Sequence, residues 1–143
     1  NSEYGDIEWM PVRYLHRAVA RKRLPGLYRA ASVALVTPLR DGMNLVAKEF
    51  VAAQDPADPG VLVLSRFAGA AEQLHEALLV NPHDTGRTAE TIQRALQMPL
   101  AERQQRHAAL LERIRTQDVH WWREAFLAAL QETRQAHARS PHE

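Results

Sequence analysis

Short runs of aliphatic residues alternate with helical patterns over the first part of the chain. Short β-branched or aliphatic runs bounded by Pro, Gly, Asp or Asn predict strands, at residues 12–15, 33–36, 61–64 and 78–80. Between these runs, apolar residues recur at helical spacing, over residues 21–31, 45–54 and 70–75. Continuous apolar strands that alternate with helices are typical of a parallel sheet covered on both faces. The pattern therefore predicts an α/β fold with right-handed crossovers.

After residue 84 the strand pattern stops and only helical patterns continue. Residues 85–96 and 99–117 each predict a helix, and Asp118 is placed to cap a third. In this last helix four apolar residues share one face: Trp122, Phe126, Ala129 and Leu130. We expect the helical tail to close the domain, with Trp121 and Trp122 as a core anchor and its partly buried neighbour.

The whole chain, residues 1–143, is expected to form one domain, with an α/β part at 1–84 and a helical tail at 85–143. The turn-rich segment 54–60 is too short to link two domains. Residues 140–143 are expected to fray.

Composition and charge exclude several classes of protein. The 143 residues are 45% hydrophobic and 24% charged, and no apolar run reaches the length of a membrane-spanning helix. A formal net charge of +1 predicts neither a nucleic-acid nor a membrane partner. The absence of Cys excludes disulfides, thiolate metal sites and a cysteine nucleophile, and is compatible with a cytoplasmic location. The seven His residues are scattered, and the sequence contains no zincin, hydrolase or P-loop motif.

The segment 33–49 is the strongest candidate for a ligand site. A buried strand ends near Thr37, a polar loop containing Asp41 and Gly42 follows, and a helix begins near Asn44. In open α/β sheets, ligands bind at this carboxyl edge, and a helix N-terminus there suits a phosphate. The alternative is that Asp41 and Asn44 only cap the helix.

Two further candidates depend on what lies around them. Glu49 is one helical turn after Leu45 and could accept hydrogen bonds from a ribose diol, or it could lie beside Lys48 on a solvated face. Lys48 is expected to be solvent-facing or structural. The segment 65–71 also follows a strand, and its Gly69 could allow close approach of a ligand or simple α/β packing.

Beyond these general patterns, the segment 36–54, Val-Thr-Pro-Leu-Arg-Asp-Gly-Met-Asn-Leu-Val-Ala-Lys-Glu-Phe-Val-Ala-Ala-Gln, closely resembles the trehalose-6-phosphate synthase family of retaining GT-B glycosyltransferases. The resemblance extends through four more segments: residues 9–15, 27–31, 60–71 and 78–82. It implies a Rossmann-like parallel sheet with helices on both faces and a helical C-terminal tail. The chain resembles only the carboxyl-terminal, nucleotide-sugar side of the two-domain family fold.

The resemblance also implies roles for residues of the 41–45 loop. Asp41 would bind hydroxyls of the donor glucose, together with the backbone amides of Gly42, Met43 and Asn44. The amides of Asn44 and Leu45 would bind the diphosphate. In the family the donor is UDP-glucose or another nucleoside diphosphate glucose.

Glu49 would bind the donor ribose, and the backbone at Leu24 would lie against the nucleobase. The family needs no metal and no cofactor. The acceptor, glucose 6-phosphate, binds in an amino-terminal domain that this sequence lacks, together with the cations that neutralise the leaving diphosphate. We therefore expect the chain to be inactive alone.

Two alternatives stay open at the level of sequence. The acceptor could differ, as in related glucosylglycerol-phosphate synthases, because the acceptor is bound elsewhere. The chain could also be a non-catalytic module that binds nucleotide sugars. Homo-oligomer formation is left open as well.

Overall fold

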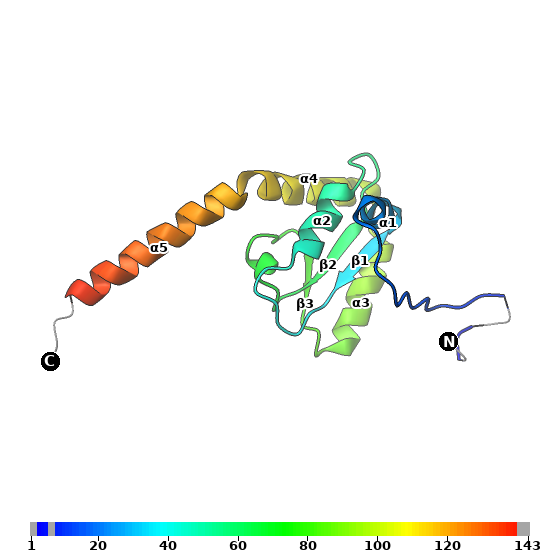
Figure 1. The fold of residues 1–143 in the computed structure, drawn as a ribbon. Coiled ribbons are helices and arrows are strands. Elements are labelled where there is room, and N and C mark those ends of the chain that lie inside the picture. The colour runs from blue at the N-terminus through cyan, green and yellow to red at the C-terminus, as the bar shows by residue number, and fades with distance from the viewer. Residues whose placement is uncertain (1–2, 6–7, 140–143) are drawn as a thin grey trace.

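A three-stranded parallel sheet forms the centre of the molecule (Figure 1), in a computed structural model that describes residues 3–5 and 8–139. Its strands, β1 (Val33–Val36), β2 (Val61–Ser65) and β3 (Leu78–Val80), lie in sequence order, with β2 in the middle. Val33 pairs with Val61, and Val63 pairs with Leu78. Three of the predicted strands and their parallel order are thus confirmed.

Helices cover both faces of the sheet because the side chains of β2 alternate between two cores. Leu62 and Leu64 face a cluster with Phe50 of α2 (Leu45–Ala53) and Leu110 of α4 (Leu100–Thr116). Val61 and Val63 face the opposite cluster, which includes Ala95 of α3 (Thr85–Leu96). Every residue of β2 is buried, as expected for a central parallel strand. The predicted α/β fold with helices on both faces is confirmed.

The first helix lies beside α2 at the edge of this body. A 3-10 turn, η1 (Arg21–Arg23), leads into α1 (Leu24–Ala30), so the predicted helix at 21–31 is confirmed with a tighter first turn. Pro25 suits the start of α1 because backbone N–H groups in the first turn have no intrahelical acceptor, so a residue without an N–H loses no hydrogen bond there. Gln54 ties the two helices together: its Nε2 donates to the Tyr28 carbonyl at 2.7 Å.

Two predicted elements are wrong. Residues 12–15 do not form a strand but run as an irregular segment away from the sheet, with Tyr14 82% exposed (Figure 1). These residues favour a strand by composition, but the segment does not pair with the sheet, which in the described residues consists of β1, β2 and β3. In place of a helix at 70–75 there is a short 3-10 turn, η2 (Gly69–Glu72), because the chain must enter β3 a few residues later.

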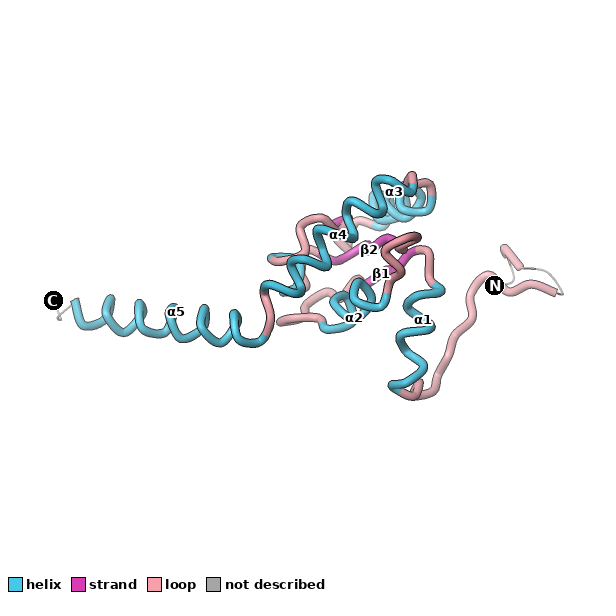
Figure 2. Tube along the Cα trace, turned by 90° about the horizontal axis from the view of Figure 1, so that it is seen from above, coloured by secondary structure: helices cyan, strands magenta, loops and turns pink. Residues whose placement is uncertain are grey.

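The last helix also departs from its predicted role. α5 (Val119–Arg139) is capped by Asp118, whose Oδ1 accepts from the amides of His120 and Trp121, and this cap is as predicted. The helix then projects away from the sheet instead of closing the domain (Figure 2). Trp121 and Trp122 are 41% and 49% exposed, so they do not anchor a core. The expected stripe exists, since the rings of Trp122 and Phe126 stack at 5.4 Å.

No helix in the described part of the chain is both long and apolar enough to cross a membrane. The predicted fraying at 140–143 falls outside the described residues.

Candidate functional site

Two loops lie side by side at the carboxyl end of the sheet, one after β1 and the other after β2. Asp41 and Ala68 form an isolated parallel bridge between them. The Gly69 amide donates to the Asp41 carbonyl at 2.9 Å, and the Ala70 amide donates to the Met43 carbonyl at 2.6 Å. The two segments that the sequence predicted separately therefore form one structure.

Gly69 permits this contact because a side chain there would strike the other loop. A Cβ at Gly69 would overlap the Gly42 carbonyl oxygen and lie 2.7 Å from the carbonyl carbon. Gly42 differs, since a Cβ added there would meet nothing within 4 Å. Gly69 thus serves packing between the loops, one of its two predicted uses, whereas Gly42 faces open space.

The side chains of Asp41 and Asn44 fix the conformation of the first loop. Asp41 Oδ1 accepts from the Met43 amide and Oδ2 from Asn44 Nδ2, both at 3.0 Å. Asn44 Oδ1 in turn caps α2 by accepting from the Ala47 amide at 2.9 Å. Asn44 is therefore the helix cap, while Asp41 braces the loop that carries the cap.

This cap leaves the start of α2 suited to an anion. Asn44 has φ 76°, a left-handed conformation that Asn tolerates better than most residues. Its side chain takes the Ala47 amide, and the preceding amides of the first turn have no intrahelical acceptor. The positive end of the helix dipole lies at the same place.

We expect Asn44→Ala to lower the free energy of unfolding by about 2 kcal/mol. About 1 kcal/mol comes from the lost cap and roughly 1 kcal/mol from an alanine in the left-handed region. Urea denaturation would measure it. Asp84→Ala is the matched control, because Asp84 caps α3 through the Arg87 amide at 3.0 Å without a positive φ. Equal losses in the two variants would contradict the backbone contribution.

Glu49 extends from α2 toward α1, where it accepts a hydrogen bond from the Tyr28 hydroxyl at 3.2 Å. Burial raises the pKa of the Tyr28 phenol, and the hydrogen bond to Glu49 and its negative charge raise it further. Leu24 begins α1 one turn before Tyr28 and is half-buried on the same face of that helix. The predicted ribose and nucleobase residues thus belong to two helices that are in contact.

Lys48 has a structural contact that the sequence pattern did not identify. Its ammonium donates to Gln73 Oε1 at 2.7 Å, and burial lowers the pKa of this ammonium. The contact joins α2 to the residue that follows η2. Lys48 is therefore a half-buried structural residue, which was one of its two predicted roles.

A groove of about 950 Å³ opens beside the loop pair. Its walls come from the loop after β1 and the start of α2, from η2, and from the junction of α4 and α5. Among the predicted site residues, Gly42, Met43 and Leu45 line it. Three residues of the loop therefore border this open space, whereas Asp41, Asn44, Glu49 and Leu24 are not part of its lining.

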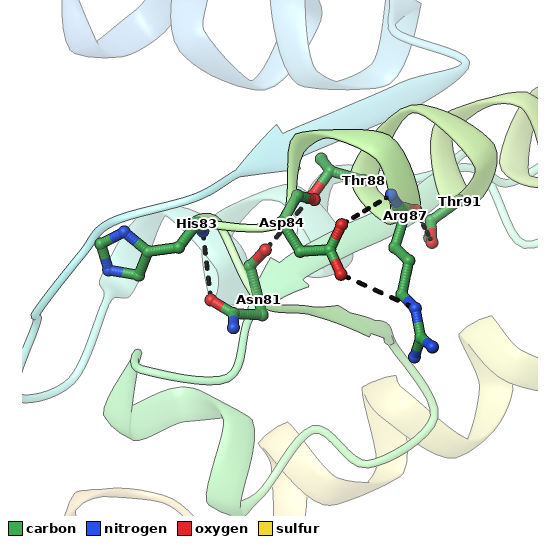
Figure 3. Close-up of polar contacts among 6 residues, drawn as sticks. All are labelled: Asn81, His83, Asp84, Arg87, Thr88 and Thr91. Atoms are coloured by element: carbon green, nitrogen blue, oxygen red, sulfur yellow. Dashed lines mark hydrogen bonds and ion pairs between the residues drawn. The ribbon is translucent and has the colours of Figure 1, made fainter.

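The third strand ends in a loop whose polar groups bond to one another (Figure 3). Asn81 Oδ1 accepts from the His83 amide at 3.1 Å, and Asp84 pairs with Arg87 at 3.6 Å. The Thr88 hydroxyl donates to the Asp84 carbonyl at 2.7 Å. These contacts start α3 and are those of a structural cap. Within residues 3–5 and 8–139, no three His, Asp or Glu side chains gather closely enough to hold a metal ion.

Comparison with known proteins gives consistent matches. A trehalose-6-phosphate synthase from Enterobacter sp. (strain 638) is 56% identical over 133 residues, which are 93% of this chain and 28% of that protein. A structure from E. coli bound with UDP-2-fluoro glucose is 55% identical with a TM-score of 0.85, over 91% of this chain and 29% of that chain. A Burkholderia xenovorans alpha,alpha-trehalose-phosphate synthase (UDP-forming) in complex with glucose-6-phosphate is 54% identical with a TM-score of 0.85. The match covers 92% of this chain and 29% of that chain.

The structures that resemble this α/β fold are GT-B glycosyltransferases, and the chain matches a carboxyl-terminal part of them. The model of glycosyltransferase family 20 matches residues 1–132. The chain belongs to glycosyltransferase family 20. It spans less than a third of the length of these relatives.

Proposed function

We propose that this chain is the donor-binding part of a retaining glucosyltransferase that forms trehalose 6-phosphate from a nucleoside diphosphate glucose and glucose 6-phosphate. The observation that carries the proposal is the braced loop at the start of α2, held against Gly69 and Ala70 and open to the groove. The similar structures support it, since one is bound with UDP-2-fluoro glucose and another with glucose-6-phosphate.

In this proposal the loop binds the negatively charged part of the donor. The amides of Asn44 and Leu45 donate to the diphosphate, aided by the positive end of the α2 dipole. Asp41 and the amides of Gly42 and Met43 bind the glucose hydroxyls. The brace between Asp41 and Asn44 holds these amides in place before the donor arrives, which lowers the entropic cost of binding.

The nucleoside lies across the two neighbouring helices. Glu49 of α2 accepts hydrogen bonds from the ribose diol, and the backbone at Leu24 of α1 lies against the base. A carboxylate has lone pairs for several donors, so its bond from Tyr28 leaves room for ribose hydroxyls.

The transfer itself requires groups beyond this chain. Retaining transfer needs positive groups that stabilise the leaving diphosphate and a second site that positions the acceptor. We propose that the complete protein supplies these and binds glucose 6-phosphate, without a resident metal or cofactor. The chain alone would then bind the donor but not transfer glucose.

We expect Glu49→Ala to weaken UDP binding about tenfold, because an exposed carboxylate contributes at the lower end of charged hydrogen bonds, roughly 1.5 kcal/mol. Isothermal titration of the chain with UDP and with 2′-deoxy-UDP measures this. The deoxy nucleotide should bind the wild type more weakly and lose less on mutation, because one partner hydroxyl is already gone. Glu112→Ala on the exposed side of α4 is the control. Equal losses for both nucleotides would contradict the ribose role, and a wild type that binds no UDP would contradict the proposed function.

A further inference from the structure

The Tyr28 hydroxyl makes a hydrogen bond whose position bears directly on the nucleotide site. It links α1 to α2 by donating to Glu49 Oε2 at 3.2 Å. Without this bond, Glu49 is an exposed side chain on a helix surface, free to adopt several rotamers. With it, one carboxylate oxygen has a fixed partner and the range of the other is restricted.

The phenol is a stiff partner because the rest of Tyr28 is fixed from two sides. Its half-buried ring packs against the core cluster that contains Phe50. Its carbonyl accepts from Gln54 Nε2 at 2.7 Å, and Gln54 Oε1 accepts from the Gly60 amide at 2.8 Å. Gln54 is only 5% exposed, so this chain of bonds is protected from water.

The Tyr28 hydroxyl also stays protonated at neutral pH, where nucleotide binding would be measured. Burial and the neighbouring Glu49 carboxylate raise the pKa of Tyr28 above its ordinary value. The phenol is therefore a donor at neutral pH, and Glu49 is the acceptor.

We propose that Tyr28 is a positioning residue that orients the Glu49 carboxylate toward the ribose diol of a nucleoside diphosphate. The inference rests on the proposed function. Tyr28 acts through Glu49: it occupies Oε2 from the α1 side and leaves the remaining lone pairs for two vicinal hydroxyls. It also lies one helical turn after Leu24, so the helix that holds the tyrosine carries the proposed base-binding residue as well.

Tyr28→Phe tests this, because it removes one oxygen and keeps the ring that packs against the core cluster. We expect UDP to bind the variant about three- to tenfold more weakly, the range for one net hydrogen bond. The binding of 2′-deoxy-UDP should change less than about twofold, since the oriented diol is incomplete in that ligand. Tyr14→Phe is the matched control, because Tyr14 is 82% exposed in the amino-terminal segment, and it should bind both nucleotides as the wild type does.

The other outcomes separate this inference from the proposed function. Equal weakening of both nucleotides would show that the hydroxyl acts only on the packing of α1, and would overturn the inference. Unchanged UDP affinity in Tyr28→Phe, with a wild type that still discriminates against the deoxy nucleotide, would overturn it and leave the proposed function standing. A wild type that binds neither nucleotide would overturn both. Thermal denaturation of each variant verifies that folded proteins are compared.

Discussion

Gly69→Ala is expected to reduce UDP-glucose affinity more than a hundredfold and to lower the free energy of unfolding by about 1–3 kcal/mol, as overpacking does. The added Cβ would overlap the Gly42 carbonyl, so the two loops must separate. Their separation breaks the bonds from the Gly69 and Ala70 amides to the Asp41 and Met43 carbonyls. The amides proposed to bind the donor then lose their fixed positions. Donor titration and urea denaturation measure the two effects.

Gly86→Ala is the control for this substitution. Gly86 lies in the first turn of α3, where an added Cβ would meet Asp84 Oδ1 at 3.8 Å, an ordinary van der Waals contact. Alanine favours the helix by up to about 1 kcal/mol, so this variant should be as stable as the wild type or more so. Normal donor binding by Gly69→Ala would show that the contact between the loops has no bearing on the site.

Asp41→Ala is expected to weaken UDP-glucose binding about 10- to 100-fold and UDP binding much less. A carboxylate that accepts from the glucose hydroxyls makes charge-assisted bonds of about 1.5–3 kcal/mol, and UDP has no glucose to lose. Some loss for UDP is also expected, because Asp41 braces Met43 and Asn44. Calorimetric titration with both ligands gives the comparison.

Asp55→Ala serves as the control for Asp41→Ala. Asp55 makes the same local contact as Asp41, accepting from the amide two residues later, Ala57, at 2.9 Å. It lies in the turn between α2 and β2, outside the loop pair, so neither ligand should be affected. If Asp41→Ala weakened UDP and UDP-glucose equally, Asp41 would be a loop brace without a role in sugar recognition.

The central part of the fold could be predicted from local pattern because its apolar runs are buried on both faces. β2 is the clearest case, with five buried residues between turn-forming segments. The run at 12–15, Val-Arg-Tyr-Leu, also contains β-type residues, but whether it becomes a strand depends on pairing with a neighbouring edge, which composition does not specify. The stripe on α5 was also correct as a pattern. A stripe predicts a buried face without naming its partner, and in the described structure that face is exposed.

The same distinction applies to the candidate site. Short-range signals located the cap at Asn44 and the loop at Asp41, because these contacts join residues at most three positions apart. The bond from Tyr28 to Glu49 and the bond from Lys48 to Gln73 join residues more than twenty positions apart. They depend on how α1 and η2 pack against α2, and no local pattern carries that information. The resemblance to a known family supplied roles for Glu49 and Leu24, but not the tyrosine between them.

The strand register also bears on the order of folding. β2 and β3 are joined by a short connection, and Val63 pairs with Leu78. β1 and β2, in which Val33 pairs with Val61, are separated by a longer segment that contains the loop after β1, α2 and the following turn. Closing the longer segment costs more chain entropy, so pairing of β2 with β3 is favoured before β1 is added. Gly42 follows β1 and Gly69 follows β2, so the contact between them requires that β1 has already paired with β2. The loop that follows β1 would therefore acquire its shape in the last step of sheet assembly, and an ensemble in which β1 is detached would retain much of its secondary structure while lacking the contact between the two loops.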